Sequence, residues 1–546
     1  MHFPAILILS RTISLSLSMS FPTQNLPDLY EAGITELQAG LDAGWFTSVD
    51  LVNAYLSRIE EVNLQGPELR AVLEVSPIAL EVAAKLDEER RVSGRRTMMH
   101  GIPVLLKDNI ATEHSEGLNT TAGSHALFKS VVPDDAGVVK RLRQAGAIIL
   151  GKANMSEFAY FRGKIPSGWS GRGGQCKSAY HPHGSPSGSS SGSGVAASVG
   201  LATVTIGTET DGSIASPSSS NNVVGVKPTV GLTSRAGVLP ITAAQDTVGP
   251  MTRSVEDAAI VLSIIAGEDP NDRRTLSQPR PVPDYPKALD INALRGKRIG
   301  VPRSSIPSST DNDNALPESI HTTFNESLQI MQSLGATIVD PANLPFAEEI
   351  KSLDHLVLYV DFKIELNEYL GALKDVPTGV RTLADAIQFN NDHPDLELPE
   401  GYSDQSELIQ SEATEGRNEA YGRALAQNVE LGATRGIDAV LKEYRLDALV
   451  LPAKGTHTPA AIAGYPTVTV PLGFFPEDEP IKYDGDGANV AYPAPGMPFG
   501  LTFVGTAFDE YALIGMAYAF EQATKVRTSR KAIAGAVPKT QLKSKS

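Results

Sequence analysis

The chain has 546 residues, of which 41% are hydrophobic and 20% charged, a balance that suits a packed globular protein and excludes a disordered one. Its 63 acidic residues against 47 Lys and Arg give a net charge of −16, which disfavours nucleic acid as a partner. The single cysteine, Cys176, excludes an internal disulfide bond and any site built from several cysteines.

The first 27 residues contain no acidic residue and are rich in serine. Their apolar runs, Pro4–Leu9 and Ile13–Met19, are too short to span a bilayer, so we expect no stable membrane insertion. Three interpretations stay open: a targeting segment, a disordered tail, or a true start at Met19. We expect a cytoplasmic protein, or a secreted or organellar one if residues 1–27 are a targeting segment. At the other end, the polar and basic Lys539–Ser546 predicts a frayed tail.

Apolar residues at three- and four-residue spacing predict helices over 28–63, with Ser48 as an N-cap. Helices are also predicted near Ile78–Arg91, Gly137–Ala145, 194–201, 255–266, 315–334 and, with an acidic interruption at 389–408, over 351–440. Strands are predicted within Gly101–Ile110 and at Ala147–Leu150, Ala202–Gly207, Gly296–Pro302, Asp447–Leu451 and Gly500–Val504. The Pro- and Asp-rich stretch 268–290 predicts a linker, and 476–498 predicts a long loop. This alternation favours an α/β fold.

Several familiar motifs match the chain poorly. The run Gly146–Lys152 is close to a P-loop, but Ala153 follows where Ser or Thr must hold magnesium. The run Gly188-Ser-Ser190-Ser-Gly192 matches the nucleophile elbow of α/β-hydrolases, but the loop before it cannot be the strand that this motif requires. His181 and His183 alone make a weak metal site, and we predict no metal ion.

Three segments can carry chemistry. Lys107 ends an apolar strand, where partial burial would lower its pKa and make it a base, or where it could simply reach out to solvent. The Ser/Gly run Ser185–Gly194 reads alone as a flexible linker, yet it leads directly into a helix and a buried strand. The segment Gly207–Ile214 is either a surface turn or a set of backbone amides suited to an oxyanion.

Together these segments resemble the amidase signature family, whose pattern is a Gly/Ser-rich run, a helix and strand, and then Gly-Thr-Asp-x-Gly-Gly-Ser. The corresponding residues here are Ser187–Ser193 and Gly207–Ser213, and the lysine motif of the family matches Gly101–Ile110. The resemblance covers roughly residues 30–525. It extends to the segments Gly225–Thr229, Gly231–Gly237, Gln245–Pro250 and Gly464–Pro466.

The resemblance implies a single α/β/α domain around a large twisted mixed sheet, in place of the several domains that length alone suggests. We place this amidase signature domain at 28–530 and a polar tail at 531–546. The resemblance assigns Ser213 as nucleophile, Lys107 as base and Ser189, held in a cis peptide, as the serine between them. It also implies that Thr210, Asp211, Gly212 and Ala159 bind the substrate, with the backbone N–H groups of 210–213 stabilising the oxyanion.

The implied activity is hydrolysis of a carboxylic or peptide C-terminal amide through an acyl-enzyme, with no cofactor and a small-molecule amide as partner. We expect a monomer or homodimer. The form Gly-Thr-Glu-Thr-Asp-Gly-Ser, together with Trp169–Gln175, looks like the peptide amidase branch and its fungal and plant relatives. A fatty acid or aryl amide hydrolase and an amidotransferase A-type subunit stay open as alternatives.

Five positions depart from the family pattern. Ser187 and Ser191 stand where the family has glycine, Glu209 replaces its aspartate, and Asp211 replaces another glycine. Ala215 occupies a position where an arginine usually follows Gly-Ser-Ile, which leaves the substrate preference open.

Overall fold

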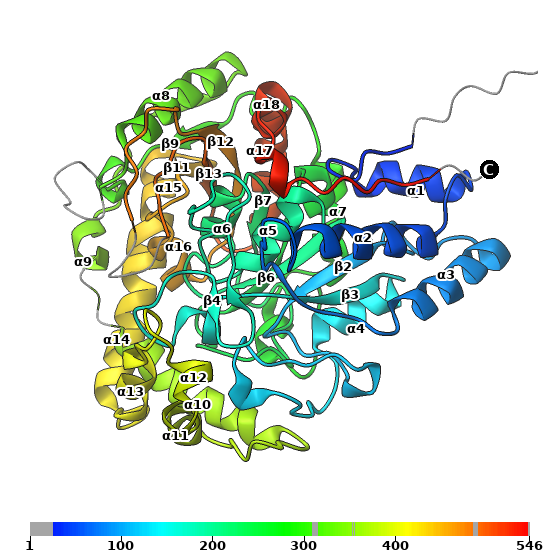
Figure 1. Cartoon of the computed structure of the whole chain (residues 1–546). Coiled ribbons are helices and arrows are strands. Elements are labelled where there is room, and N and C mark those ends of the chain that lie inside the picture. The colour runs from blue at the N-terminus through cyan, green and yellow to red at the C-terminus, as the bar shows by residue number, and fades with distance from the viewer. Residues whose placement is uncertain (1–25, 308–314, 352, 354, 484–489, 544–546) are drawn as a thin grey trace, which may run out of the picture.

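The computed structural model describes residues 26–307, 315–351, 353, 355–483 and 490–543 (Figure 1). Within these residues, 11 strands form one mixed sheet. In their order across the sheet they are β1 (Val72–Val75), β3 (Ile148–Ala153), β2 (Pro103–Lys107), β6 (Val204–Glu209), β8 (Thr247–Thr252), β7 (Val224–Lys227), β12 (Thr467–Phe474), β13 (Pro498–Val504), β11 (Ala448–Pro452), β9 (Arg298–Gly300) and β10 (Thr337–Val339). A separate small hairpin pairs β4 (Trp169–Ser170) with β5 (Gly174–Gln175).

Helices surround this sheet, and those between α10 and α14 gather together at the lower left of Figure 1. In the first half of the chain they are α1 (Ile34–Asp42), α2 (Ser48–Val62), α3 (Ala79–Ser93), α4 (Gly137–Gln144), α5 (Ser191–Val199), α6 (Ala215–Ser220) and α7 (Val255–Ile265). In the second half they are α8 (Glu318–Ser333), α9 (Ala347–Lys351), α10 (Leu356–Ala372), α11 (Leu383–Asp392), α12 (Pro394–Glu397), α13 (Ser406–Glu412), α14 (Glu419–Val429), α15 (Asp438–Tyr444), α16 (Thr458–Ala463), α17 (Glu510–Thr524) and α18 (Val526–Ser529).

Two strands at the centre of the sheet, β2 and β6, end next to each other. Strand β2 pairs in parallel with both β3 and β6, and all of its residues are buried. A parallel strand covered on both faces suits the continuous apolar run that the sequence shows there. Because β2 and β6 are parallel, their carboxyl ends meet, and Lys107 lies beside the turn that follows Glu209.

Helix α5 is buried along its whole length and connects the Ser/Gly run to β6. Three buried arginines, Arg58, Arg253 and Arg527, donate hydrogen bonds to the carbonyls of residues 197–200 at its C-terminal end, at 2.6–3.2 Å. Carbonyls at a buried helix end need such partners, and positive charge there is favoured by the helix dipole. The arginines therefore fix the helix whose first turn follows Ser189.

Most predicted helices are confirmed, with one correction at the start of α2. We expected Ser48 to be the N-cap, but Thr47 holds that position. The Thr47 hydroxyl accepts a hydrogen bond from the Asp50 N–H, and the Asp50 carboxylate accepts one from the Thr47 N–H, which makes a capping box.

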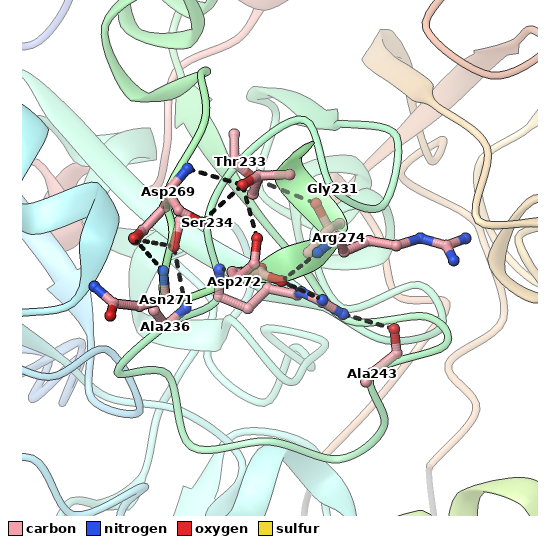
Figure 2. Close-up of polar contacts among 12 residues, drawn as sticks. Gly231, Thr233, Ser234, Ala236, Ala243, Asp269, Asn271, Asp272 and Arg274 are labelled. Carbon is pink, nitrogen blue, oxygen red and sulfur yellow. Dashed lines mark hydrogen bonds and ion pairs between the residues drawn. The ribbon is translucent and has the colours of Figure 1, made fainter. Parts of the chain in front are cut away.

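The predicted linker at 268–290 is wrong, because this stretch is docked onto the loop at 231–243 (Figure 2). The Arg235 side chain donates two hydrogen bonds to the Asp272 carboxylate, at 2.9 and 2.7 Å, and a third to the Ala243 carbonyl at 2.6 Å. The Ser234 hydroxyl donates to Asp269 at 2.6 Å. Asp269 and Asp272 thus act as acceptors within the domain rather than as solvent-facing spacers.

The expected frayed C-terminus is wrong for Lys539–Gln541. The carboxylate of Glu61, on α2, accepts hydrogen bonds from the backbone N–H groups of Lys539 and Thr540. The Thr540 carbonyl accepts a hydrogen bond of 2.6 Å from Arg58. At the other end, almost all of the segment 1–27 lies outside the described residues. No helix of the described chain combines the length and apolar character needed to cross a bilayer.

Replacing Arg58 with methionine tests the anchoring of α5. The variant keeps the length of the side chain but leaves buried carbonyls without donors, so we expect the free energy of unfolding to fall by about 3 kcal/mol. Urea unfolding followed by circular dichroism measures the change. Arg91→Met is the matched control, because the Arg91 side chain is 71% exposed. Equal stability of Arg58→Met and the control would show that the anchoring contributes little.

Candidate active site

Lys107 lies at the carboxyl end of β2 with no exposed surface. Its Nζ donates a hydrogen bond to the Thr208 carbonyl at 3.0 Å and lies 2.8 Å from Ser189 Oγ. Burial lowers the pKa of Lys107 to about 7, although the negative charges of Asp246 and Glu209 oppose part of the shift. Burial therefore favours the neutral amine at this position.

The two serines continue from the lysine as a chain of hydrogen bonds. Ser189 follows a cis peptide bond with Gly188 and immediately precedes Ser190, the N-cap of α5. The Ser189 hydroxyl donates to Ser213 Oγ at 2.9 Å. Three residues from distant parts of the sequence, Lys107, Ser189 and Ser213, thus form one continuous path along which protons can move.

Ser190, the centre of the rejected nucleophile-elbow motif, has a different environment. Its hydroxyl donates to the Thr208 carbonyl at 3.1 Å and accepts from the Thr208 N–H at 3.3 Å, and the residue is fully buried. Its side chain therefore joins the Ser/Gly run to strand β6. The structure shows a loop before it, in agreement with the sequence-based objection to that motif.

The turn after β6 is shaped by Glu209. Its carboxylate accepts hydrogen bonds from the backbone N–H groups of Ile214, at 2.6 Å, and Ala215, at 2.8 Å. The preceding N–H groups, those of residues 210–213, have no acceptor among the residues that the structure describes. Unpaired N–H groups beside Ser213 can bind an external oxygen that carries negative charge.

Asp211 forms a contact that the sequence did not predict. Its carboxylate accepts hydrogen bonds from His457 Nδ1 and, at 3.0 Å, from the Thr458 hydroxyl. Burial raises the pKa of Asp211, but the charge and hydrogen bond of His457, the hydrogen bond of Thr458 and the charge of His355 together lower it more, so the net shift is downward. A lone histidine between two threonines carries no sequence signal of its own, and only the fold reveals that it meets Asp211, 246 residues earlier in the chain.

A cavity of about 390 Å³ opens over these groups. Four of the predicted site residues besides Ala159 line it: Ser189, Thr210, Asp211 and Ser213. The other two predicted site residues, Gly212 and the fully buried Lys107, are not among the residues that line the cavity. The rest of the lining includes apolar, charged and imidazole side chains, among them Phe161, Ile241, Leu358, Lys164, Glu407, His355 and His457.

Ala159 belongs to a strained wall of the cavity. Phe158, Ala159 and Tyr160 have φ values of 47, 57 and 72°, a left-handed conformation that costs each of these residues of order 1 kcal/mol. The ring of Phe362, on α10, packs against Phe158 and Phe161 with ring centroids 6.4 and 4.9 Å apart. Packing by α10 therefore holds this wall in place.

A reactive cysteine and a bound metal ion are two other ways in which an enzyme can attack an amide. Cys176 is fully buried, and burial raises the pKa of its thiol, which makes it a poor nucleophile. Among the described residues, no three His, Cys, Asp or Glu side chains come together in a way that could hold a metal ion.

Comparison with known proteins places the chain in a family. The Amidase family model matches residues 50–514. A probable amidase of Arabidopsis thaliana is 40% identical over 540 residues, covering 97% of each chain. The A-type subunit of a glutamyl-tRNA(Gln) amidotransferase from Geobacter metallireducens is 32% identical over 515 residues, covering 93% of this chain and all of the other.

Among solved structures, the peptide amidase of Stenotrophomonas maltophilia is 42% identical and superposes with a TM-score of 0.82, covering 94% of this chain and 99% of the other. The predicted α/β fold around one large mixed sheet is thereby confirmed. The chain belongs to the amidase signature family, and it is an amidase, an enzyme that acts on carbon–nitrogen bonds.

Proposed function

We propose that the enzyme hydrolyses a carboxylic or peptide C-terminal amide to an acid and ammonia or an amine, through an acyl-enzyme on Ser213. The observation that carries the proposal is the unbroken path from Lys107 Nζ through Ser189 Oγ to Ser213 Oγ, in steps of 2.8 and 2.9 Å. A serine hydroxyl is a weak nucleophile until a base removes its proton, and this path supplies one.

In the first half of the reaction, the neutral amine of Lys107 takes a proton from Ser189, which takes one from Ser213. The Ser213 oxygen then attacks the amide carbonyl, and the N–H groups of residues 210–213 hold the developing oxyanion. One such donor contributes about 2.7–4 kcal/mol to the stability of a transition state of this kind. When the C–N bond breaks, Ser189 passes a proton to the leaving nitrogen and regains one from Lys107.

In the second half, water takes the place of the departed ammonia or amine. The relay removes a proton from the water, and the resulting hydroxide attacks the ester carbonyl of the acyl-enzyme. The C–O bond to Ser213 breaks, the serine recovers its proton through Ser189, and the carboxylic acid leaves. Every proton is carried by groups of this chain, so the proposed cycle needs no metal ion or organic cofactor.

The likeness to a peptide amidase favours peptide C-terminal amides as the substrate class. The principal alternative is a transamidating subunit, because amidotransferase A-type subunits are more distant relatives. Ammonia release from a peptide amide such as N-acetyl-phenylalaninamide supports the hydrolase. Ammonia release only from glutamine, in the presence of charged tRNA and partner subunits, would support the alternative. The same panel includes fatty acid amides and aryl amides, because a hydrolase of these amides is the third candidate.

Ser213→Ala tests the nucleophile. The variant lacks one hydroxyl at the cavity surface, so we expect it to fold normally and to lose at least about 10⁴-fold in kcat. A fluorophosphonate probe, located by peptide mass spectrometry, is expected to label Ser213 and no residue in 187–193. Cys176→Ala is the matched control and retains both activity and labelling. Labelling at Ser190 would instead support the nucleophile-elbow mechanism.

The pH dependence of kcat tests the base. Only neutral Lys107 can accept a proton, so activity is expected to rise as the pH passes through about 7 and then to level off. Lys107→Arg is expected to lose several orders of magnitude in kcat, because a guanidinium stays protonated at every accessible pH. Substantial activity in Lys107→Arg, with the protein still folded, would show that Lys107 is structural.

A further inference from the structure

The pair formed by Asp211 and His457 lies at the catalytic turn but has no step in the proposed relay. His457 comes from the loop between β11 and α16, and it lines the cavity together with Asp211. The His457 and Asp211 side chains are 24% and 28% exposed, so the pair is reachable from the cavity while remaining largely shielded from solvent. The site thus holds a polar group whose purpose the relay does not explain.

The two nitrogens of the His457 ring have different surroundings. Nδ1 donates to Asp211, whereas Nε2 makes no hydrogen bond with any part of the chain that the structure describes. Nε2 lies where a side chain on Gly212 would stand, since a Cβ built there would be 2.6 Å from it. Glycine at 212, which has a φ of +84°, therefore leaves room for the imidazole beside the N–H groups of the turn.

The charges of the pair and of the surrounding cavity favour a neutral ligand group. Asp211 and an imidazolium cancel each other, and the remaining charged side chains of the cavity, Lys164 and Glu407, are of opposite sign. A free carboxylate would find no excess positive charge here. A carbonyl oxygen can accept one hydrogen bond from Nε2–H without bringing in a charge that the cavity must balance.

We infer that His457 is a specificity residue, oriented by Asp211, whose Nε2–H donates a hydrogen bond to a second carbonyl on the acyl part of the substrate. The inference rests on the proposed function. The acyl side is assigned because Nε2 lies against the turn that holds the oxyanion, whereas the leaving nitrogen departs beside Ser189. The enzyme then prefers N-acylated amino acid amides, which carry such a carbonyl, to simple carboxamides of the same length.

The hydrogen bond depends on the protonation of His457. Burial lowers the pKa of His457, but the charges of Asp211 and Glu209 outweigh burial and the opposing Lys454, so the net shift is upward. His355 is the other titratable group that acts on the pair, through Asp211. Below the raised pKa, Nε2 carries a proton. Above it, Asp211 retains the remaining proton on Nδ1, and Nε2 becomes an acceptor that cannot bind a carbonyl.

Two variants separate the two ring nitrogens. His457→Asn places an amide N–H near the position of Nδ1, so it can keep the contact with Asp211 while it lacks the Nε2 donor. His457→Gln places its amide N–H near the position of Nε2. The probes are N-acetyl-phenylalaninamide and 3-phenylpropanamide, which differ only in the acetamido group, and kcat and KM are measured for both across pH.

For His457→Asn we expect KM for the acetylated amide to rise about 10-fold, the effect of one lost hydrogen bond, and KM for the plain amide to rise much less. His457→Gln is expected to recover part of the loss. In the unmodified enzyme, KM for the acetylated amide is expected to rise at high pH. This rise is absent in His457→Asn, because an amide does not titrate.

Three results would overturn the inference. An equal fall in kcat for both amides would place His457 at the oxyanion instead, and an unchanged KM in His457→Asn would leave it a purely structural residue. A KM that stays constant across pH in the unmodified enzyme would show that the imidazole does not bind the substrate. Absence of hydrolysis of either amide by a folded, fluorophosphonate-reactive enzyme would instead contradict the proposed function itself.

Discussion

The site depends on one constraint, the burial of the Lys107 side-chain amine away from water. Lys107 ends a strand that is covered on both faces, so its amine is removed from water before any substrate arrives. Desolvation disfavours the charged form, and the negative charges of Asp246 and Glu209 only partly oppose it. Glu209 is engaged with the backbone of the turn, and Asp246 accepts hydrogen bonds from Thr210, Ile241 and Thr242. Neither forms an ion pair with Lys107.

The same sheet explains how groups from distant segments meet. Strands β2 and β6 run in parallel, so the lysine and the 210–213 turn emerge at one edge. Helix α5 then brings Ser189 between them, with its far end held by the three arginines. The geometry of the relay is therefore a property of the central sheet and of one buried helix, while α10 and the segments near His457 form the walls of the cavity.

Much of this arrangement could be predicted from the sequence. The long amphipathic helices follow from their periodicity, and the three relay residues follow from the resemblance to a family. Strands such as β12 and β7 were missed because they are short or buried on both faces, and they are defined by partners far away in the chain. The stretch 268–290 has the composition of a linker, and only its contacts with Ser234 and Arg235 show that it is part of the domain.

The departures from the family pattern have different physical explanations. Asp211 has a partner, His457, which the sequence alone could not identify. Glu209 has a side chain long enough to reach the N–H groups of Ile214 and Ala215. Ser191 donates a hydrogen bond to the Ser187 carbonyl at 2.6 Å, so the two serines that stand in place of family glycines contact each other. Nothing in the structure explains why Ala215 stands in place of an arginine.

The central claim is that Lys107 is neutral when the enzyme works, and NMR titration tests it without turnover. Lysine labelled with ¹³C at Cε reports the protonation of each amine, and the Lys107→Arg variant identifies the Lys107 signal. This control is needed because burial also lowers the pKa of Lys152 and of Lys227 to about 8. The account predicts that the Lys107 signal titrates with a midpoint near 7. A signal that stays in its protonated position up to the ordinary pKa of lysine, about 10.4, would contradict it.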